Sequence, residues 1–304
     1  MSESVYITGG SGLLALNWAM AIRQRCRVIL GLHTRQVSLV GVETRPAHLD
    51  CVALIVKDLE ESGAQLVVHS AGLTSVEGCE ANPGLAQRLN VELAENVAQA
   101  CSNLGLPLVH ISTDHLFSGD LPLVDEGQPT KPINVYGRTK ADAEVRVLAA
   151  HPGTLVVRTN FFGWGPRYRR SFSDTILASL RSGEPISLFR DVFYTPIIIE
   201  NLVRAVHELV DRRIGGIFNV TGDERISKCQ FGYMIARYFE LDPGLIRPGS
   251  LADKPGLVQR PNDMSLSNAK ATSLLGRNLG GPHEHLARLH EQEELGFASE
   301  MRKL

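Results

Sequence analysis

A tyrosine and a lysine, Tyr136 and Lys140, stand four residues apart near the middle of this chain. On a helix, residues at this spacing share one face, so the phenol and the ammonium are predicted to enter the same pocket. A neighbouring ammonium favours the phenolate and lowers the pKa of the tyrosine, which eases proton transfer near neutral pH. This pair therefore suits acid–base chemistry at a carbonyl oxygen.

A glycine-rich segment near the start of the chain reads Thr8-Gly9-Gly10-Ser11-Gly12-Leu13-Leu14-Ala15. It follows an apolar run and precedes a helical pattern, so its backbone N–H groups lie at a helix N-terminus, where a pyrophosphate binds. We expect Gly9 to make the turn, Gly12 to allow close approach of the pyrophosphate, and Ala15 to pack the helix on the strand. For the loop alone, a purely structural turn is the alternative. Together with the tyrosine, the loop indicates hydride transfer to or from a carbonyl carbon.

The end of the second predicted strand bears on the choice of cofactor. NAD enzymes place an acidic residue there for the ribose 2′-hydroxyl, whereas an arginine accommodates a 2′-phosphate. No Asp or Glu occurs from Ser4 through Val42, and the strand end reads Leu32-His33-Thr34-Arg35. A guanidinium pairs well with phosphate, so NADP is the predicted cofactor. NAD is the alternative if Arg35 only caps an exposed loop.

Strands and helices must alternate to bring these residues together. Apolar runs at 5–8, 28–30, 66–69, 108–111 and 155–158 are separated by helical patterns at 13–25, 53–62, 83–104 and 135–149. The runs lack polar alternation, which is typical of parallel strands covered by helices on both faces. We therefore predict an α/β fold, a Rossmann doubly wound parallel sheet.

After about residue 160, turn residues become frequent and the segments between them shorten. Helices are predicted at 172–181, 199–212 and 228–240, a strand at 216–220, and a polar helix from Pro282 onward. We predict a dinucleotide-binding domain over residues 1–160, with part of 191–220 returning to it. A smaller, interleaved C-terminal substrate lobe is expected over 161–304.

The bulk composition excludes several classes of protein. The 304 residues have a net charge of −2, which gives no support for a nucleic-acid or anionic-membrane partner. Five scattered cysteines without a C-x-x-C pair fit reduced thiols in a cytosolic protein. The uncharged stretch from Ser4 to Ile22 contains three glycines and Asn17, so it is no continuous apolar helix, and the first charge is Glu3 rather than a basic residue. We expect a cytoplasmic protein.

Several motifs, taken in order, resemble the extended class of the short-chain dehydrogenase/reductase superfamily, and within it the dTDP-4-dehydrorhamnose reductase-like group. They are the glycine loop, His69-Ser70-Ala71-Gly72, Val76-Glu77-Gly78-Cys79-Glu80, Asn90-Val91, Ile111-Ser112-Thr113-Asp114, Asn134-Val135-Tyr136-Gly137-Arg138-Thr139-Lys140, Arg158-Thr159-Asn160, and Arg260-Pro261-Asn262-Asp263. The resemblance covers nearly the whole chain.

The resemblance implies roles for particular residues. Tyr136 would protonate the substrate oxygen, Lys140 would bind the nicotinamide ribose and lower the tyrosine pKa, and Thr113 would hydrogen-bond the reacting oxygen. Asp50 falls where the family contacts the adenine amino group, with Cys51 beside it. The expected cofactor contacts are Gly9, Ser11, Gly12, Leu13, Leu14, His33, Arg35, Asp50, Cys51, Ser70, Ala71, Gly72, Thr74, Tyr136 and Lys140. The expected substrate contacts are Thr113, His115, Asn160, Trp164 and Arg260.

Some of these residues have a second interpretation. His115 stands where the group usually has tyrosine, and it is either a substrate contact or a packed residue. Trp164 either stacks on a base or sugar, or anchors the second lobe. His283, His285 and His290 lack the i, i+4 pair of a helical zinc motif, so no metal is expected and a solvated helix is favoured.

The resemblance implies an NAD(P)-dependent oxidoreductase that reduces a keto group on a nucleotide-linked deoxysugar. A sugar-nucleotide epimerase uses the same residues and is an alternative. A non-catalytic NADP-binding regulatory subunit is another, because the group includes a regulatory partner of an adenosylmethionine-forming enzyme. A 4,6-dehydratase is disfavoured, since His115 replaces the second carboxylate after Asp114. Residues 112–115 are adjacent and cannot converge as a hydrolase triad. A homodimer through helices 83–104 and 135–149 is expected.

Overall fold

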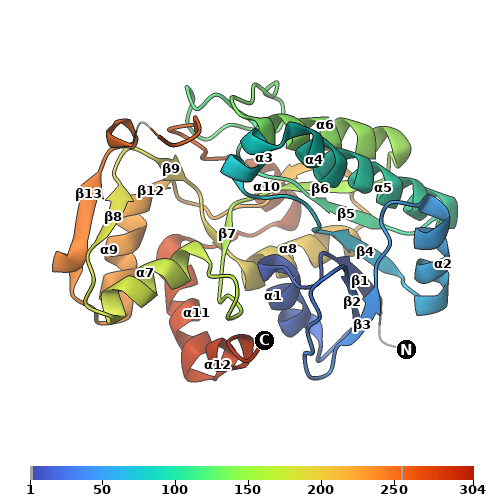
Figure 1. Cartoon of the computed structure of the whole chain (residues 1–304), viewed down its shortest axis with the longest axis horizontal. Coiled ribbons are helices and arrows are strands. Elements are labelled where there is room, and N and C mark those ends of the chain that lie inside the picture. Colours follow the sequence, from blue (N-terminus) through green and yellow to red (C-terminus); the bar gives the residue numbers. More distant parts are fainter. Residues whose placement is uncertain (1–2, 255) are drawn as a thin grey trace.

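The computed structural model describes residues 3–254 and 256–304 (Figure 1). Within these residues, the central sheet has seven parallel strands in the order β11-β6-β5-β4-β1-β2-β3. The strands are β1 (Ser4–Thr8), β2 (Arg27–Leu32), β3 (Glu43–Pro46), β4 (Leu66–His69), β5 (Leu108–Ile111), β6 (Leu155–Arg158) and β11 (Gly216–Asn219). The strand order reverses between β1 and β4, and ligands of open parallel sheets bind at the carboxyl ends beside such a point.

Helices cover both faces of this sheet, as a doubly wound fold requires. Helices α1 (Leu13–Ile22) and α8 (Ile199–Asp211) lie on one face, over Val5, Ile7 and their neighbours. Helices α2 (Val52–Ser62), α5 (Leu93–Leu104) and α6 (Val135–Ala150) cover the other, over Tyr6 and Val67. Successive strand residues thus enter opposite cores, so every position of β1, β4, β5 and β6 is buried and most of these residues are apolar. The predicted fold class is confirmed.

The predicted elements of the cofactor-binding half differ from the observed ones in four places. Strand β3 was not predicted, because its residues are polar and largely exposed at the edge of the sheet. Helix α1 ends at Ile22 rather than at residue 25. The helix predicted over 83–104 is α4 (Pro83–Gln87), a π-helical turn (Arg88–Glu92) and α5 in succession. A short helix, α3 (Val76–Ala81), precedes it.

The remaining elements build a second body at the carboxyl end of the sheet, on the left in Figure 1. Its helices are α7 (Phe172–Arg181), α9 (Lys228–Tyr238), α11 (Pro282–Glu294) and α12 (Phe297–Met301), whereas α10 (Ala269–Leu275) packs on β11 and α8. Its short strands pair as β7 (Phe161–Phe162) with β10 (Ile197–Ile198), β8 (Ile186–Phe189) with β13 (Ile246–Gly249), and β9 (Phe193–Tyr194) with β12 (Ile226–Ser227). The chain returns to the central sheet at α8 and β11, and the Arg23–Glu300 ion pair at 2.5 Å ties α12 to the end of α1.

None of the described helices has the length and apolar character needed to cross a membrane.

Candidate active site

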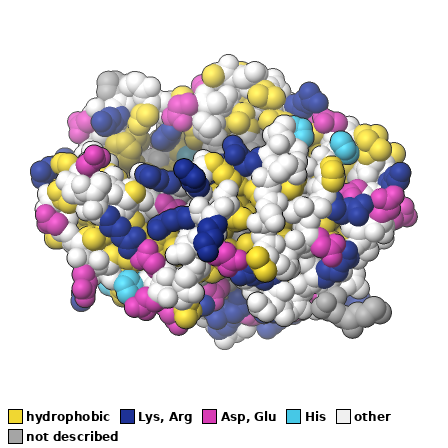
Figure 2. Space-filling model, turned by 60° about the horizontal axis from the view of Figure 1, so that its bottom comes forward, with side chains coloured by type: hydrophobic (Ala, Val, Ile, Leu, Met, Phe, Trp, Pro, Cys, Tyr) yellow, Lys and Arg dark blue, Asp and Glu magenta, His cyan; other side chains and the backbone are white. Residues whose placement is uncertain are grey.

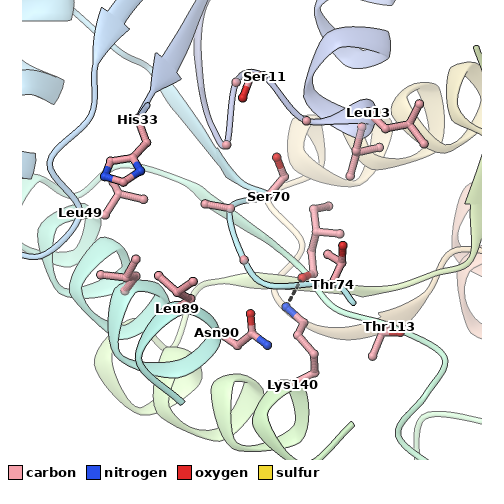
Figure 3. A pocket seen from close by; sticks show the side chains of 18 of the residues that line it. Ser11, Leu13, His33, Leu49, Ser70, Thr74, Leu89, Asn90, Thr113 and Lys140 are labelled. Atoms are coloured by element: carbon pink, nitrogen blue, oxygen red, sulfur yellow. Dashed lines mark hydrogen bonds between the residues drawn. The ribbon is translucent and has the colours of Figure 1, made fainter. Parts of the chain in front are cut away.

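A cavity of about 880 Å³ runs along the carboxyl ends of the central strands. At one end it is lined by His33, Arg35 and Asp50, and at the other by Thr113, Tyr136, Lys140, His115 and Asn160. The glycine loop and residues 70–72 and 74 also line the cavity, and Figure 3 shows Ser11 and Ser70 between His33 and Thr113. The cavity therefore contains both the glycine loop and the Tyr136–Lys140 pair.

The glycine loop has the geometry that its residue types predict. Gly9 has a φ of +68°, and a Cβ there would lie 2.9 Å from the backbone of Ala71, so only glycine fits. Gly12 begins α1 without a side-chain cap, which leaves the first-turn N–H groups of the helix free for a ligand. Ala15 is fully buried in the core beneath the loop.

A segment far along the chain covers the glycine loop, and the sequence analysis missed it. The Tyr168 hydroxyl donates to the Ser11 carbonyl at 2.7 Å, and the Arg169 guanidinium donates to the Thr74 hydroxyl at 2.5 Å. The Arg35 guanidinium stacks over the Tyr168 ring at 4.0 Å. Arg35 is exposed at the mouth of the cavity, which leaves its N–H groups accessible. A local sequence pattern carries no signal for contacts over such separations.

At the adenine end, only one of the two adjacent predicted residues lines the cavity. Asp50 does, and its carboxylate accepts a hydrogen bond from Arg88 at 2.6 Å. Cys51 is exposed and lies outside the lining residues, so the structure does not bring its side chain into the cavity. Its backbone is extended, and successive side chains of extended backbone point in opposite directions.

The tyrosine is placed by close packing at the start of α6. The Asn134 side chain caps the helix by accepting from the Gly137 N–H at 2.8 Å. A Cβ at Gly137 would lie 2.3 Å from the His115 carbonyl oxygen, so glycine is required for the helix to approach the segment after β5. The His115 ring meets the Tyr136 ring edge-on at 5.5 Å. Tyr136 is thereby held beside Thr113 in the cavity.

The predicted lowering of the tyrosine pKa is wrong for this structure. Burial raises the pKa of Tyr136 to about 12, the Thr113 hydroxyl opposes this rise, and the Asp114 carboxylate adds to it. The ammonium of Lys140 instead donates to the Ile111 carbonyl at 2.7 Å (Figure 3, dashed line). Tyr136 therefore keeps its proton through neutral pH, as a proton donor must.

The lysine is itself buried between α6 and the sheet. Burial lowers the pKa of Lys140 to about 8, while Glu144, one turn further along α6, opposes the shift. The Glu144 carboxylate is bound to Arg158 at 2.7 Å and accepts from the Ser112 hydroxyl at 2.5 Å. A buried lysine with several fixed neighbours is a candidate functional group rather than a solvated one.

Beyond the tyrosine, the second body supplies polar groups around Asp114. The Asn160 side chain donates to the Asp114 carboxylate, and both residues line the cavity. The Lys228 ammonium lies 3.4 Å from the centre of the Tyr194 ring, and burial lowers the pKa of Lys228 to about 8 while Asp114 opposes the shift. Four buried polar atoms in this part of the described chain have no hydrogen-bond partner: His115 Nδ1, the Thr159 hydroxyl, the Tyr194 hydroxyl and Arg260 Nε. Tyr194 and Lys228 were not predicted as site residues.

Two of the predicted substrate contacts do not line the cavity. Trp164 is 1% exposed, its indole N–H donates to the Leu289 carbonyl at 3.3 Å, and its ring packs on Phe239. It anchors the second body, so the predicted stacking on substrate is wrong. Arg260 pairs with Glu77 of α3 instead of entering the cavity, although its charge helps to lower the pKa of His115.

The C-terminal histidines lie apart from the cavity. His285 is fully buried, with Nε2 3.0 Å from the Leu279 carbonyl, so α11 is only partly the solvated helix that was expected. Among the described residues, no cluster of three or more His, Cys, Asp and Glu side chains suits a metal ion.

Comparison with known proteins adds a family to this geometry. The sequence matches the family described as RmlD substrate binding domain over residues 3–294. It is 28% identical to the probable low-salt glycan biosynthesis reductase Agl14 of Haloferax volcanii, over 89% of this chain and 92% of that protein. It is 26% identical to dTDP-4-dehydrorhamnose reductase of Sinorhizobium fredii, over 93% and 95%. It is also 26% identical to the methionine adenosyltransferase 2 subunit beta of Rattus norvegicus, over 90% and 83%.

The fold has a close counterpart among solved structures. The structure of dTDP-4-dehydrorhamnose reductase from Bacillus anthracis in complex with NADP superposes with a TM-score of 0.82. The two chains are 24% identical, and the match covers 96% of this chain and 100% of that one. The two chains thus share the arrangement of strands and helices described above.

Proposed function

Because the chain belongs to the RmlD substrate binding domain family, we propose that it is an NADP-dependent reductase of a keto group on a nucleotide-linked deoxysugar. One observation carries the proposal: Thr113, Tyr136 and Lys140 line the same cavity as the glycine loop. Reductases named among the relatives support the substrate class.

The cavity suits a phosphorylated dinucleotide in size and in charge. The first-turn N–H groups of α1 suit the pyrophosphate, and Arg35 with His33 suits a 2′-phosphate, with NAD as the alternative cofactor. Lysine and arginine side chains gather across the middle of one face of the molecule, and such a field attracts anionic ligands (Figure 2). When bound, NADPH supplies the hydride that reduces the carbonyl carbon.

Residues of the chain stabilise the charge that develops on the carbonyl oxygen and supply its proton. The Thr113 hydroxyl donates a hydrogen bond to this oxygen as negative charge develops on it. Tyr136 transfers its phenolic proton to the oxygen, which completes the hydroxyl group of the product. The Lys140 ammonium lies in the same cavity, where it would bind the nicotinamide ribose beside the reacting oxygen.

The polar groups around Asp114 suit the sugar of the substrate. Buried polar groups without partners are costly, and hydroxyl groups of a sugar can satisfy them. His115 Nδ1 and the Tyr194 hydroxyl are such groups, and the Lys228 ammonium lies beside them. Asn160 and His115 are the proposed substrate contacts of the cavity wall, and Arg260 borders them from outside it.

The test is incubation of the purified protein with NADPH and a panel of 4-keto nucleotide sugars, with a known reductase as the active control. We expect oxidation of NADPH with at least one member of the panel. No oxidation with any of them, beside an active control, contradicts the proposal. A tightly retained cofactor that turns over without net oxidation assigns the chain to the epimerases instead.

The similarity to an adenosyltransferase subunit favours one further candidate, a cofactor-binding subunit without its own chemistry. Recovery of a stoichiometric enzyme partner, together with a Tyr136→Phe variant that works as well as the wild type, would support it. The intact set of Thr113, Tyr136 and Lys140 favours the reductase.

The domain division and the oligomeric state belong to the same proposal. We assign residues 1–160 to cofactor binding, with α8 and β11 returning to that domain, and the rest of 161–304 to the substrate. We propose a homodimer through α5 and α6, where Val145 is 70% exposed. Light scattering at micromolar concentration tests it, and a monomer there contradicts the dimer.

A further inference from the structure

A row of three polar side chains crosses the central sheet directly beneath the cavity. Thr8, His69 and His110 occupy paired positions on β1, β4 and β5. They share the face that carries Tyr6 and Val67, so they lie between the sheet and the helices on the side of α6. All three are at most 1% exposed, and the two imidazole rings stack at a centroid distance of 5.5 Å. Neither histidine has a role in the reaction proposed above.

The hydrogen bonds of Thr8 fix the protonation of His69. The Thr8 oxygen accepts from the N–H groups of Ser70 at 3.2 Å and Ala71 at 3.3 Å, which occupy both of its lone pairs. Its own proton is therefore donated to His69 Nδ1, which lies 2.9 Å away. His69 must accept at Nδ1, so it is neutral with its proton on Nε2.

The lysine fixes the protonation of His110 in the same way. The Lys140 ammonium donates to the Ile111 carbonyl at 2.7 Å, and its second neighbour is His110 Nε2 at 3.4 Å. An ammonium has no lone pair, so His110 must accept at Nε2 and carry its proton on Nδ1. Strand β5 thus offers the lysine two acceptors, one from its backbone and one from a side chain.

We propose that His110, backed by the stacked His69 and by Thr8, is a positioning residue that holds the charged Lys140 in place for the reaction. The proposal rests on the proposed function, in which Lys140 contacts the cofactor and the reacting centre. The first residue of the row, Thr8, also holds part of the cavity wall. Its hydroxyl oxygen accepts from the backbone N–H groups of Ser70 and Ala71, which line the cavity. Contacts through Thr8, His69 and His110 therefore connect the segment after β4 with Lys140.

Few charged groups lie near this row of Thr8, His69 and His110. Glu144 is the charged group of α6 that acts on Lys140, and its carboxylate is already bound to the buried Arg158. Burial lowers the pKa of both rings, and the charge of Lys140 lowers it further. For His110, His69 lowers the pKa as well. A neutral acceptor therefore supports the ammonium without a second buried charge, whose desolvation would be costly.

The first test needs neither cofactor nor substrate. Nitrogen-15 NMR of histidine-labelled protein reports which ring nitrogen carries the proton. We expect His69 protonated on Nε2 and His110 on Nδ1, with neither ring titrating between about pH 5 and pH 8. His110 protonated on Nε2, or charged within that range, overturns the proposal.

The second test compares two variants in which an amide side chain replaces the imidazole of His110. His110→Gln places an acceptor near the position of Nε2, whereas His110→Asn places one near Nδ1 and leaves the lysine without its partner. A hydrogen bond to the charged form of a group raises the pKa of a base, so its loss lowers that pKa. We expect the alkaline limb of NADPH binding and of kcat to move down by about one pH unit in His110→Asn, with little change in His110→Gln.

The control is His207→Gln, which alters a buried histidine that accepts from Trp18 at 3.1 Å and does not line the cavity. It should leave the pH profile unchanged. Equal profiles for His110→Asn and wild type, in folded proteins that bind NADPH, overturn the positioning role. A wild type that binds no NADPH contradicts the proposed function instead, while the NMR result still decides the protonation of the row.

Discussion

Tyr136 combines two properties that a sequence motif cannot separate. Its spacing from Lys140 predicts a shared cavity, which the structure has, and a lowered pKa, which it does not. Burial dominates because the ammonium is directed to the Ile111 carbonyl. For reduction this is the useful state, since a phenol that keeps its proton at neutral pH can give it to the substrate.

The first prediction concerns this proton. Tyr136→Phe removes the donor and keeps the ring, so we expect kcat to fall by about 10²- to 10⁴-fold while the Kd for NADPH changes little. Steady-state kinetics and a fluorescence titration measure the two quantities. An unchanged kcat would remove Tyr136 from the chemistry.

Arg35 carries the second prediction at this scale. Arg35→Ala should raise the Kd for NADPH by about 10- to 100-fold and leave the Kd for NADH nearly unchanged, because the lost bond is one to a phosphate. The exposed Arg167, which does not line the cavity, gives the matched control Arg167→Ala. Equal losses for both cofactors would show that Arg35 acts by stacking on Tyr168 rather than by binding phosphate.

Residues were predictable where a short motif sets the geometry. The glycine loop, Thr113, Tyr136 and Lys140 all line the cavity as expected. Cys51 and Trp164 do not, because the first depends on the direction of an extended backbone and the second on packing against a distant helix. Tyr168 reaches the cavity from a remote segment, and no local pattern marks it.

At the scale of elements, the interrupted helix between residues 83 and 104 has a structural purpose. Its π-helical turn carries Asn90, whose side chain binds the N–H of Leu73 at 2.7 Å, the carbonyl of Leu73 at 3.1 Å and the Thr139 hydroxyl at 3.0 Å. The turn therefore fixes the segment after β4 against α6, on both sides of the cavity. Such π-turns are often found at functional sites.

The third prediction tests this element. Asn90→Ala leaves buried backbone groups of Leu73 without partners, which should lower the free energy of unfolding by about 2 kcal/mol and weaken NADPH binding. Asn103→Ala, at an exposed position of α5, is the control. Urea denaturation measures both variants, and equal stability of the two would contradict the role of Asn90.

Most strands of the central sheet could be located in the sequence because they are buried on both faces and therefore form apolar runs. Six of the seven central strands and the main helices were predictable because apolar runs and helical periods alternate. The edge strand β3 was not, since its exposed polar residues are indistinguishable from a loop. The π-turn was hidden because the inserted residue leaves the helical pattern almost unchanged.

The whole molecule contains buried neutral histidines, and these make its stability depend on pH. Burial lowers the pKa of His69 to about 3 and of His207 to about 4, below the value of about 6.5 in an unfolded chain. The unfolded chain then binds protons more readily, so stability is present above about pH 6.5 and is lost as the pH falls toward the folded values.

The fourth prediction follows from this difference. Between about pH 7 and pH 5, each of the two histidines should remove about 2 kcal/mol from the free energy of unfolding. His69→Asn retains an acceptor for Thr8 but does not titrate, so its loss over this range should be smaller by about that amount. Urea denaturation at both pH values gives the result, and equal losses in variant and wild type would mean that His69 is not buried in neutral form.

The central claim is that this cavity carries out NADPH-dependent reduction of a keto sugar linked to a nucleotide. The most direct measurement is the absorbance of NADPH during incubation with the panel of 4-keto nucleotide sugars, for the wild type and Tyr136→Phe in parallel. We expect the absorbance to fall with at least one sugar for the wild type and to stay nearly constant for the variant. Constant absorbance for the wild type with every sugar, while a known reductase is active, would contradict it.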